Sequence, residues 1–412
     1  MPKLILAYSG GLDTTTAIKW LTVERGYEIV ALNIDVGRSR EQALLEERGY
    51  AAGAVKVTVI DAREDFLRYF AFPALAAGAI YQEGYPLATA LARPLMAKLL
   101  VDVAHEEGAT AVAHGCTGKG NDQVRFDVAI QTLDPSIEIV APTREQAMAR
   151  ETQMEYLAQH GVHIPWGDKG PFSIDENLWG RSAEAGVLED PWVEPPPDAY
   201  EWTKDPDTVQ AEPVYVELGF EHGMPVTIDG VGHHPIELVE RLNELGGEHG
   251  VGRLDQIEDR LVGIKSREVY EAPAALILHA AHKALEAMTL SKQQIKLKRY
   301  VADEYADLIY NGLWFSAHHQ DIAAYIASTQ RHVTGVVRMR IGRGRAVPVG
   351  RRAEKSLYEL SLATYDKDDA YDQSAAVGFI NIWGLQSRVQ ARRQLIGAPE
   401  ETLRIATPGE RA

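Results

Sequence analysis

The stretch Leu4-Ile-Leu-Ala-Tyr-Ser-Gly-Gly-Leu-Asp-Thr-Thr15 decides the fold of this chain. An apolar run ends at Ser9, two glycines follow, and a helix-like run begins at Thr14. Glycines leave backbone N–H groups free to face a bound anion, and a helix N-terminus behind them adds its positive end. The sequence therefore predicts a strand, a tight turn and a helix that together cradle phosphate or pyrophosphate, with Asp13 at the rim.

This loop is not a Walker A loop, which has four residues between its glycines and then Lys followed by Ser or Thr. Asp13 stands where such a loop carries its lysine. Ser-Gly-Gly alone also occurs in ordinary turns. The prediction of a phosphate-binding loop therefore depends on the strand before it and the helix after it. The pattern resembles the pyrophosphate loop of ATP pyrophosphatases, which cleave ATP between the α and β phosphates.

The composition is that of an ordinary globular protein of 412 residues, long enough for two or three domains. A net charge of −17 disfavours a nucleic-acid groove, because phosphate backbones need clustered positive charge. Cys116 is the only cysteine, so no intrachain disulfide can form. With no signal peptide and no apolar run of about 18 residues, we expect a cytoplasmic protein without a membrane partner.

Strands and helices alternate over residues 1–165. We expect strands at 4–8, 28–34, 54–60, 110–114 and 137–140, with a last helix through Gln159. Such alternation predicts a doubly wound parallel sheet that binds its ligand at the carboxyl ends of the strands. Ser9 and Gly115 both follow strand ends, so residues 1–165 are predicted to be a nucleotide-binding domain.

The alternation stops near residues 160–171, and residues 170–365 are predicted to form a second, α+β domain with helices at 235–246 and 272–289. Residues 331–352 hold seven arginines in alternation. A nucleic-acid patch is conceivable there, but the period of two and the lack of aromatic residues among the arginines favour a hairpin with one solvated face.

Residues 366–412 are predicted to be a C-terminal helix and tail. One helical stripe carries large apolar side chains, namely Phe379, Ile382, Trp383, Leu385 and Val389. Such a helix either packs on its own domain or docks on a neighbouring subunit, and the pattern leaves both open.

A second loop, Gly115-Cys-Thr-Gly-Lys-Gly-Asn-Asp-Gln-Val-Arg-Phe126, carries three glycines in six residues. Its polar groups are a hydroxyl, an ammonium, an amide, a carboxylate and a guanidinium, from Thr117, Lys119, Asn121, Asp122 and Arg125. Acids bind amines, whereas hydroxyls, amides and arginine bind carboxylates. This set suits a small zwitterion better than it suits a solvated loop.

Together, the segments 7–15 and 115–126 resemble the two signatures of the argininosuccinate synthase family. The similarity continues through Tyr85–Pro94, Ser173–Asn177, Val187–Trp192, Gly250–Arg253, Glu258–Gly263, Ser266–Glu271 and Lys355–Tyr358. The resemblance implies an adenine nucleotide alpha-hydrolase-like sheet followed by a synthetase domain. It also implies a ligase of arginine biosynthesis that condenses citrulline with aspartate, through a citrullyl-adenylate, to argininosuccinate, AMP and pyrophosphate.

The resemblance also implies roles for individual residues. ATP would be bound by Ala7, Tyr8, Ser9, Gly10, Gly11, Leu12, Asp13, Thr14, Thr15, Ile34 (through its backbone) and Gly115. Citrulline would be bound at Tyr85, Ala90, Asn121, Arg125, Ser173, Ser182, Glu258 and Tyr270. Aspartate would be bound by Thr89, Thr117, Asn121 and Asp122.

Asp13, Asp122 and Arg125 are the predicted catalytic residues. No general base stands out, so the rate is expected to come from positioning and from charge stabilisation at phosphorus. Mg²⁺ is expected to bridge the ATP phosphates with at most one carboxylate from the protein, Asp13 or Asp122, and without a metal-binding cluster. A structural ion pair remains the alternative role for Glu258 and Arg125.

Two positions depart from the family pattern. Thr15 replaces a more frequent serine and keeps the hydroxyl, whereas Ala90 stands where serine is common and would lose one hydrogen bond to substrate. The pairs His233-His234 and His318-His319 raise the question of a metal site. Adjacent side chains in a strand point to opposite faces and cannot easily bind one ion together, so we expect these histidines to be surface or capping residues.

A non-catalytic sensor of nucleotide and amino acid is the competing function, although the intact loops at 9–15 and 115–126 disfavour it. No nucleic-acid partner is expected. The resemblance implies a homotetramer, with the terminal helix as an arm exchanged between subunits.

Overall fold

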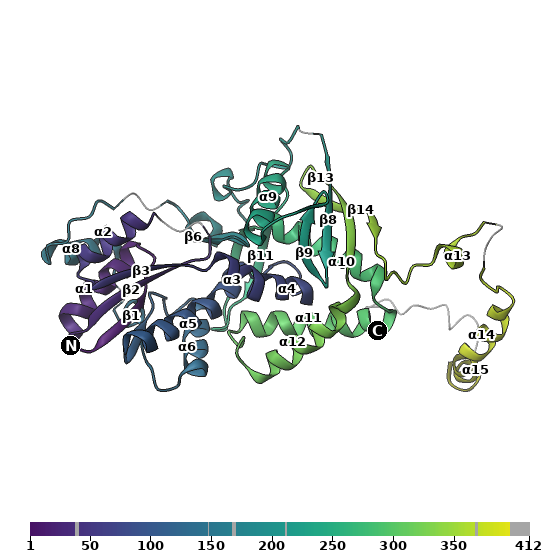
Figure 1. Ribbon diagram of the computed structural model, residues 1–412, viewed down its shortest axis with the longest axis horizontal. Coiled ribbons are helices and arrows are strands. Elements are labelled where there is room, and N and C mark those ends of the chain that lie inside the picture. The colour runs from purple at the N-terminus through teal and green to yellow at the C-terminus, as the bar shows by residue number, and fades with distance from the viewer. Residues whose placement is uncertain (38–40, 147, 167–169, 211, 367–369, 396–412) are drawn as a thin grey trace, which may run out of the picture. The chain divides into compact units, whose positions relative to one another are not determined.

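The computed structural model describes residues 1–37, 41–146, 148–166, 170–210, 212–366 and 370–395 (Figure 1). Residues 1–357 form one compact unit and residues 358–412 form another. Among the described residues, no helix has both the length and the apolar character needed to cross a membrane.

A parallel sheet with the strand order β3-β2-β1-β4-β5 begins the first unit. Its strands are β1 (Lys3–Ala7), β2 (Glu28–Asp35), β3 (Lys56–Asp61), β4 (Ala111–Ala113) and β5 (Glu138–Val140). The accompanying helices are α1 (Leu12–Arg25), α2 (Gln42–Ala52), α3 (Arg63–Phe66), α4 (Phe72–Ala77), α5 (Ala88–Glu107), α6 (Asp122–Leu133), α7 (Pro142–Glu145) and α8 (Arg150–Gln159). A π-helical turn, Leu67–Ala71, joins α3 to α4. The predicted doubly wound sheet is therefore confirmed.

Both faces of this sheet are covered by helices (Figure 1). Leu4 and Leu6 pack in one buried cluster with Ile18 of α1, whereas Ile5, which lies between them in β1, packs in another cluster with Leu100 of α5. Successive side chains of a strand point to opposite faces, so a strand covered on both faces needs an unbroken apolar run. This requirement explains why the chain opens with Leu-Ile-Leu.

The strand order changes direction between β1 and β4, because β2 and β3 lie on one side of β1 and β4 and β5 lie on the other. In open α/β sheets a crevice forms at such a point, outside the carboxyl ends of the strands. The loop 8–11 follows β1 and the loop 114–121 follows β4, so both glycine-containing loops begin at this crevice.

Two antiparallel sheets follow, with the strand orders β11-β12-β7-β6 and β10-β9-β8-β13-β14. Their strands are β6 (Ser173–Asn177), β7 (Gly180–Glu184), β8 (Val214–Glu221), β9 (Met224–Ile228), β10 (Val231–Gly232), β11 (Arg253–Asp259), β12 (Lys265–Glu271), β13 (Gly335–Gly342) and β14 (Arg345–Arg352). The helices of this part are α9 (Pro235–Glu248), α10 (Pro273–Thr289), α11 (Lys292–Tyr310) and α12 (Ala317–Thr329). The predicted helices at 235–246 and 272–289 and the arginine-rich hairpin are thus present.

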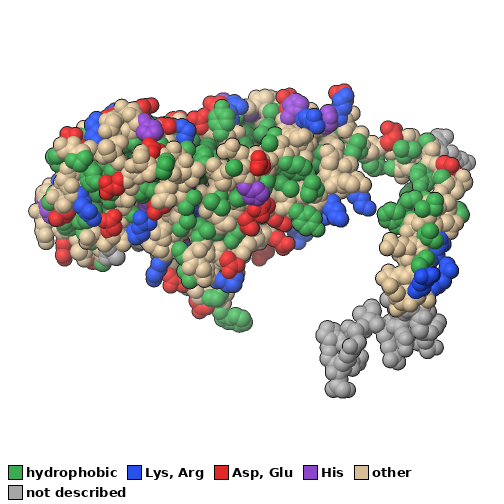
Figure 2. Space-filling view, turned by 90° about the horizontal axis from the view of Figure 1, so that it is seen from below, with side chains coloured by type: hydrophobic (Ala, Val, Ile, Leu, Met, Phe, Trp, Pro, Cys, Tyr) green, Lys and Arg blue, Asp and Glu red, His purple; other side chains and the backbone are tan. Residues whose placement is uncertain are grey.

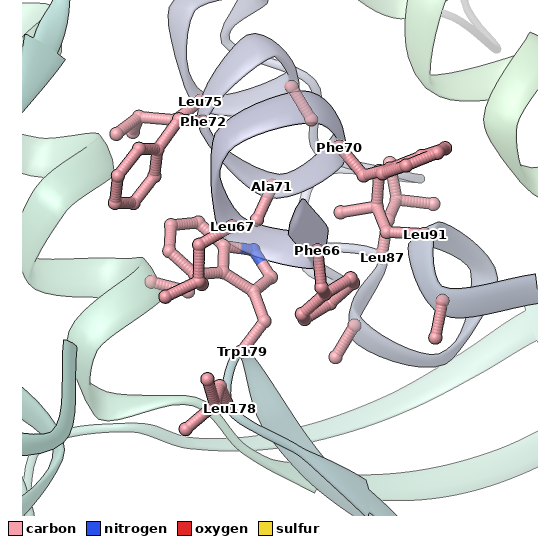
Figure 3. Packing of buried hydrophobic residues seen from close by; sticks show 14 of the residues in the cluster. Phe66, Leu67, Phe70, Ala71, Phe72, Leu75, Leu87, Leu91, Leu178 and Trp179 are labelled. Carbon is pink, nitrogen blue, oxygen red and sulfur yellow. The ribbon is translucent and has the colours of Figure 1, made fainter. Parts of the chain in front are cut away.

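Trp179 anchors the β6–β7 hairpin to the helices that connect β3 to β4 of the parallel sheet. Its side chain is fully buried, its indole Nε1 donates to the backbone oxygen of Pro86 at 3.1 Å, and its ring meets Phe72 edge-on. Figure 3 shows the indole enclosed by side chains of the segment from Phe66 to Leu75. Because this hairpin carries Ser173 and Ser182, burial of Trp179 holds two predicted substrate residues against α5.

The C-terminal unit contains α13 (Leu360–Ala363), α14 (Ala375–Trp383) and α15 (Leu385–Gln390). The predicted single helix is interrupted, since α14 ends at Trp383 and Gly384 separates it from α15. None of the described side chains of these three helices is buried. Figure 2 shows hydrophobic side chains over much of this segment.

Candidate active site

The loop after β1 presents the N-terminus of α1 as an anion cradle. Gly10 has φ +70°, a left-handed conformation that favours glycine, and Gly11 is the N-cap residue. Because Gly11 has no side chain, it offers no side-chain acceptor to the first N–H groups of the helix, and its backbone oxygen accepts the Thr15 N–H at 3.0 Å. The N–H groups that precede Thr15 in the helix are left to a ligand or to solvent, as a phosphate site requires.

Hydroxyl groups line the start of the same helix. Ser9 Oγ lies 3.2 Å from Thr14 Oγ1 and accepts the Gly11 N–H at 3.3 Å. Within the described part of the chain, the buried hydroxyls of Thr15 and Thr16 have no hydrogen-bond partner. Buried polar atoms are nearly always paired, so unpaired hydroxyls beside an open helix N-terminus fit a polar ligand.

The second glycine-containing loop lies directly against the first. A Cβ atom on Gly115 would come within 3.0 Å of Thr14 Cγ2, so the close approach of the loops depends on a glycine there. The same loop leads into α6, which begins at Asp122. The start of α6 is therefore held next to the anion cradle.

A cavity of about 220 Å³ opens beside the start of α6. Its lining comes from the sheet β11-β12-β7-β6, from α5 and α6, and from the loops beside them, with Tyr85, Thr89, Gly120, Asn121, Asp122, Arg125, Ser173, Asp175, Ser182, Glu184, Glu258, Arg260, Glu268 and Tyr270. The lining combines guanidinium groups with a larger number of carboxylates, as recognition of a zwitterion requires.

Asp122 is held between two arginines. Its carboxylate accepts from Arg93 Nη2 at 2.7 Å and from Arg125 Nη1 at 2.9 Å, and Arg93 also pairs with Asp175. Burial opposes ionisation of Asp122, but the two guanidinium groups outweigh it and lower the pKa of the carboxyl to about 2. Asp122 is therefore an anion at neutral pH and a weak base.

Glu258 is buried and receives two tyrosine hydroxyls. Tyr270 Oη donates to Glu258 Oε2 and Tyr310 Oη donates to Glu258 Oε1, each at 2.7 Å. Tyr85 stacks on Tyr270 with ring centroids 4.2 Å apart, and burial raises the pKa of both phenols. The tyrosines thus remain neutral donors that orient the Glu258 carboxylate. Among the described ion pairs Arg125 pairs with Asp122 and not with Glu258, so the alternative of an ion pair between Glu258 and Arg125 is not observed.

The wall of the cavity that includes Glu258 is acidic, since Tyr270 Oη also donates to Glu268 at 3.1 Å. Arg260 pairs with Glu184 and, at 3.2 Å, with Glu268. Burial, with the nearby carboxylates of Glu258 and Glu184, raises the pKa of Glu268 to about 8. This wall has more acid than arginine can neutralise, so a ligand's ammonium group would be stabilised there.

Not every predicted site residue lies at the cavity. Seven of the eight predicted citrulline residues line it, but Ala90 is fully buried in the core. The expected loss of a hydrogen bond between residue 90 and substrate is therefore not supported by this geometry. Thr117 is exposed and does not line the cavity, whereas the other predicted aspartate residues do.

The predicted nucleotide residues are grouped around α1 and its neighbours. Tyr8 is buried, and the side chain of Ile34 is buried within β2, so a backbone contact of Ile34 with nucleotide stays a prediction. Asp13 is exposed and its Oδ1 accepts from Gln153 Nε2 at 2.8 Å.

Several polar residues at the cavity were not anticipated from the sequence. They are Arg93, Asp175, Glu184, Arg260 and Glu268, with Tyr310 behind the lining. All but Glu184 and Tyr310 fall inside segments that carry the family resemblance, which was the available signal. For the helix that ends at Tyr310, the capping box of Ser291 and Gln294 was the overlooked start signal.

The histidine pairs behave differently from one another. His234 is an exposed N-cap residue of α9 and His318 is exposed beside Glu304, as expected. His319, in contrast, is buried against Tyr305 and Trp314, and burial lowers its pKa to about 4. The expectation of a surface or capping residue is wrong for His319, because it faces inward from α12.

A doubly wound parallel sheet, an anion cradle at its switch point and an adjoining zwitterion-sized cavity define a nucleotide-binding enzyme of small charged substrates. The model of the arginosuccinate synthase N-terminal HUP domain matches residues 3–163, and that of the arginosuccinate synthase C-terminal domain matches residues 172–390.

Proteins named argininosuccinate synthase are similar over nearly the whole chain. A relative from Dehalococcoides mccartyi is 54% identical over 394 residues, which cover 96% of this chain and 97% of the relative. Relatives from Bacillus licheniformis and Bacillus subtilis are 52% and 50% identical, each over 94% of this chain and 96% of the relative. The chain therefore belongs to the argininosuccinate synthase family.

Proposed function

We propose that this protein condenses citrulline with aspartate at the expense of ATP, giving argininosuccinate, AMP and pyrophosphate. The observation that carries the proposal is the contact between the two glycine-containing loops, which sets an anion cradle beside a cavity suited to a zwitterion. The family membership of the chain supports the same reaction.

In this proposal the triphosphate lies on the N-terminus of α1, and citrulline occupies the cavity. Arg125 offers a guanidinium to the citrulline carboxylate, since its Nη2 is buried without a partner among the described residues. The ammonium group lies toward the acidic wall that includes Glu258. The ureido oxygen can then attack the α-phosphorus, forming the citrullyl-adenylate and releasing pyrophosphate.

Aspartate completes the reaction in the second step. Its amine attacks the ureido carbon and the bond from that carbon to the AMP oxygen breaks. The proton that the amine loses passes to the departing AMP phosphate or to water. We place the aspartate ammonium near Asp122, whose low pKa makes it an anchor for a cation rather than a proton acceptor. The residues of the chain thus act by binding and orientation, which bring the reacting atoms together.

Pyrophosphate release tests the proposal. The purified protein is given ATP and Mg²⁺ with citrulline and aspartate together, and then with each omitted. We expect release to require citrulline, with sustained turnover only when aspartate is added. No release under any combination would contradict the proposal and favour a sensor that binds nucleotide without turnover.

Mg²⁺ is proposed to accompany ATP, since hard oxygen ligands from phosphates and one carboxylate suit this ion. Asp13 fits that role because it is exposed in the first turn of α1, and among the described residues only Gln153 donates a hydrogen bond to its carboxylate, at Oδ1. When bound, the ion would neutralise charge on the phosphates. We expect Asp13→Asn to raise the Mg²⁺ concentration for half-maximal activity several-fold. An unchanged Mg²⁺ dependence would contradict the role of Asp13.

A homotetramer in the cytoplasm is proposed as the working form. The lone cysteine fits a reducing compartment. The described part of residues 358–390 exposes many large apolar side chains. These side chains favour association with other copies of the chain, because contiguous exposed apolar patches mark interfaces.

A further inference from the structure

Tyr310 lies at the C-terminal end of α11 and contacts three of the predicted substrate residues at once. Its hydroxyl donates to Glu258 Oε1 at 2.7 Å and accepts from Asn121 Nδ2 at 2.9 Å. Its backbone oxygen accepts from Arg125 Nε at 2.9 Å, and its ring lies 4.7 Å from the Arg125 guanidinium carbon. Tyr310 itself is 1% exposed and does not line the cavity.

The surroundings of Tyr310 restrict its position. Its ring stacks on Tyr81 with centroids 3.6 Å apart, and Tyr81 Oη donates to the backbone oxygen of Asp259 in the strand that carries Glu258. Two residues after Tyr310, a Cβ atom on Gly312 would come within 2.8 Å of Arg125 Cα. The end of α11 therefore presses directly against the backbone of α6.

We propose that Tyr310 is a positioning residue that sets the geometry of the citrulline site by orienting Glu258, Asn121 and Arg125 together. These three residues come from two elements that are far apart in the sequence, with Glu258 on β11 and with Asn121 and Arg125 at the start of α6. Without the shared hydroxyl, a buried carboxylate and a buried amide each lose one partner. Glu258 is then held by Tyr270 alone and Asn121 by the Leu261 N–H, so each side chain is less firmly oriented toward the cavity.

The test is the kinetics of Tyr310→Phe, which keeps the ring stacking and the backbone bond to Arg125 but removes the hydroxyl. We expect the KM for citrulline to rise about tenfold or more, since a hydrogen bond to a charged group is lost. The KM for ATP should change less than twofold, because the anion cradle on α1 is not in contact with Tyr310. Tyr305→Phe is the matched control on the same helix, since the Tyr305 hydroxyl has no hydrogen bond within the described part of the chain.

A double-mutant cycle checks that Tyr310 acts through Glu258. If it does, Tyr310→Phe and Glu258→Gln together should cost clearly less than the sum of their separate effects on kcat/KM for citrulline. Fully additive effects would overturn the proposal. A Tyr310→Phe variant whose citrulline KM stays within twofold of wild type would also overturn it. An equal rise in the KM of all three substrates together with a lowered Tm would do the same, because that result indicates general destabilisation of the protein.

This inference rests on the proposed function, but the two fail in different ways. A wild-type protein that releases no pyrophosphate would contradict the proposed function. An active wild-type protein whose Tyr310→Phe variant keeps the wild-type citrulline KM would contradict only the role of Tyr310.

Discussion

Asp122 and Glu268 line the same cavity, yet their surroundings move their pKa values in opposite directions. Two guanidinium groups lower the pKa of Asp122 to about 2 against the effect of burial, whereas burial and neighbouring carboxylates raise that of Glu268 to about 8. The side chains differ by one methylene, so the charge of the neighbours and not the residue type decides which one carries a proton at neutral pH.

The raised pKa of Glu268 predicts a pH-dependent stability. The folded protein holds a proton there between the ordinary value of 4.5 and about 8, whereas the unfolded chain releases it. Folding is therefore disfavoured progressively by this group as the pH rises through that window. We expect Glu268→Gln, which mimics the protonated acid, to raise Tm relative to wild type by about 2 °C or more at pH 8 and by less at pH 5.

Thermal unfolding at pH 5, 6.5 and 8 measures this difference. Glu106→Gln is the control, because Glu106 is exposed and its substitution removes the same charge from the surface. A gap in Tm between Glu268→Gln and wild type that is constant across pH would show that Glu268 ionises normally in the folded protein.

At the scale of elements, two loop-to-helix junctions build the site. The loop after β1 leads into α1 and the loop after β4 leads into α6, and the adjacent pairing of β1 with β4 brings them together. The point of contact is Gly115 against Thr14. The proposed phosphate site on α1 and the proposed substrate site at α6 therefore meet at the packing of one glycine.

A methyl group at that contact should weaken nucleotide binding. In Gly115→Ala the new Cβ would lie 3.0 Å from Thr14 Cγ2, so the start of α1 or the loop after β4 must shift. We expect the KM for ATP to rise about fivefold or more, because anion binding depends on the placement of the N–H groups of α1. Steady-state kinetics with varied ATP measures the change.

Gly118→Ala is the matched control in the same loop, since its Cβ would meet nothing nearer than Arg144 Cγ at 3.8 Å. Equal ATP KM values for Gly115→Ala and wild type would mean that the loops adjust without cost. A similar rise in both variants would point to the flexibility of the loop rather than to the Thr14 contact.

At the scale of the whole molecule, the two units differ in how far their apolar side chains are buried. The first unit buries an extended core, whereas Phe379, Ile380, Ile382 and Trp383 of the second are each more than 60% exposed. A helix with an apolar surface is stabilised when that surface is buried. In the proposed tetramer, the apolar side chains of this helix would be buried against another copy of the chain.

Charged residues on α14 should therefore disrupt assembly. We expect Phe379→Asp with Trp383→Asp to reduce the mass measured by light scattering from that of a tetramer to a smaller species at micromolar concentration. Gln386→Asp with Ser387→Asp is the control of equal charge on exposed positions of α15. A tetramer that persists in the Phe379 and Trp383 variant would contradict the role of the arm.

Local pattern by itself predicted the parallel sheet and the glycine-containing loop of the anion cradle, whereas most cavity residues were identified only through the family resemblance of the segments that contain them. A strand covered on both faces must be an unbroken apolar run, and a phosphate loop must carry glycine before a helix. Both features can therefore be predicted from a few consecutive residues. The break at Gly384 was visible as a glycine, but no local rule distinguishes a tolerated glycine from one that ends a helix.

Only the tertiary structure decided which groups act together. Arg93, Asp122 and Asp175 come from α5, α6 and β6, and Tyr310 reaches Glu258 across 52 residues of chain. The burial of Ala90 and of His319 likewise depends on elements packed from elsewhere. Contacts of this kind arise from the docking of helices on sheets, whose geometry is set by the whole apolar core and not by the residues next to each site.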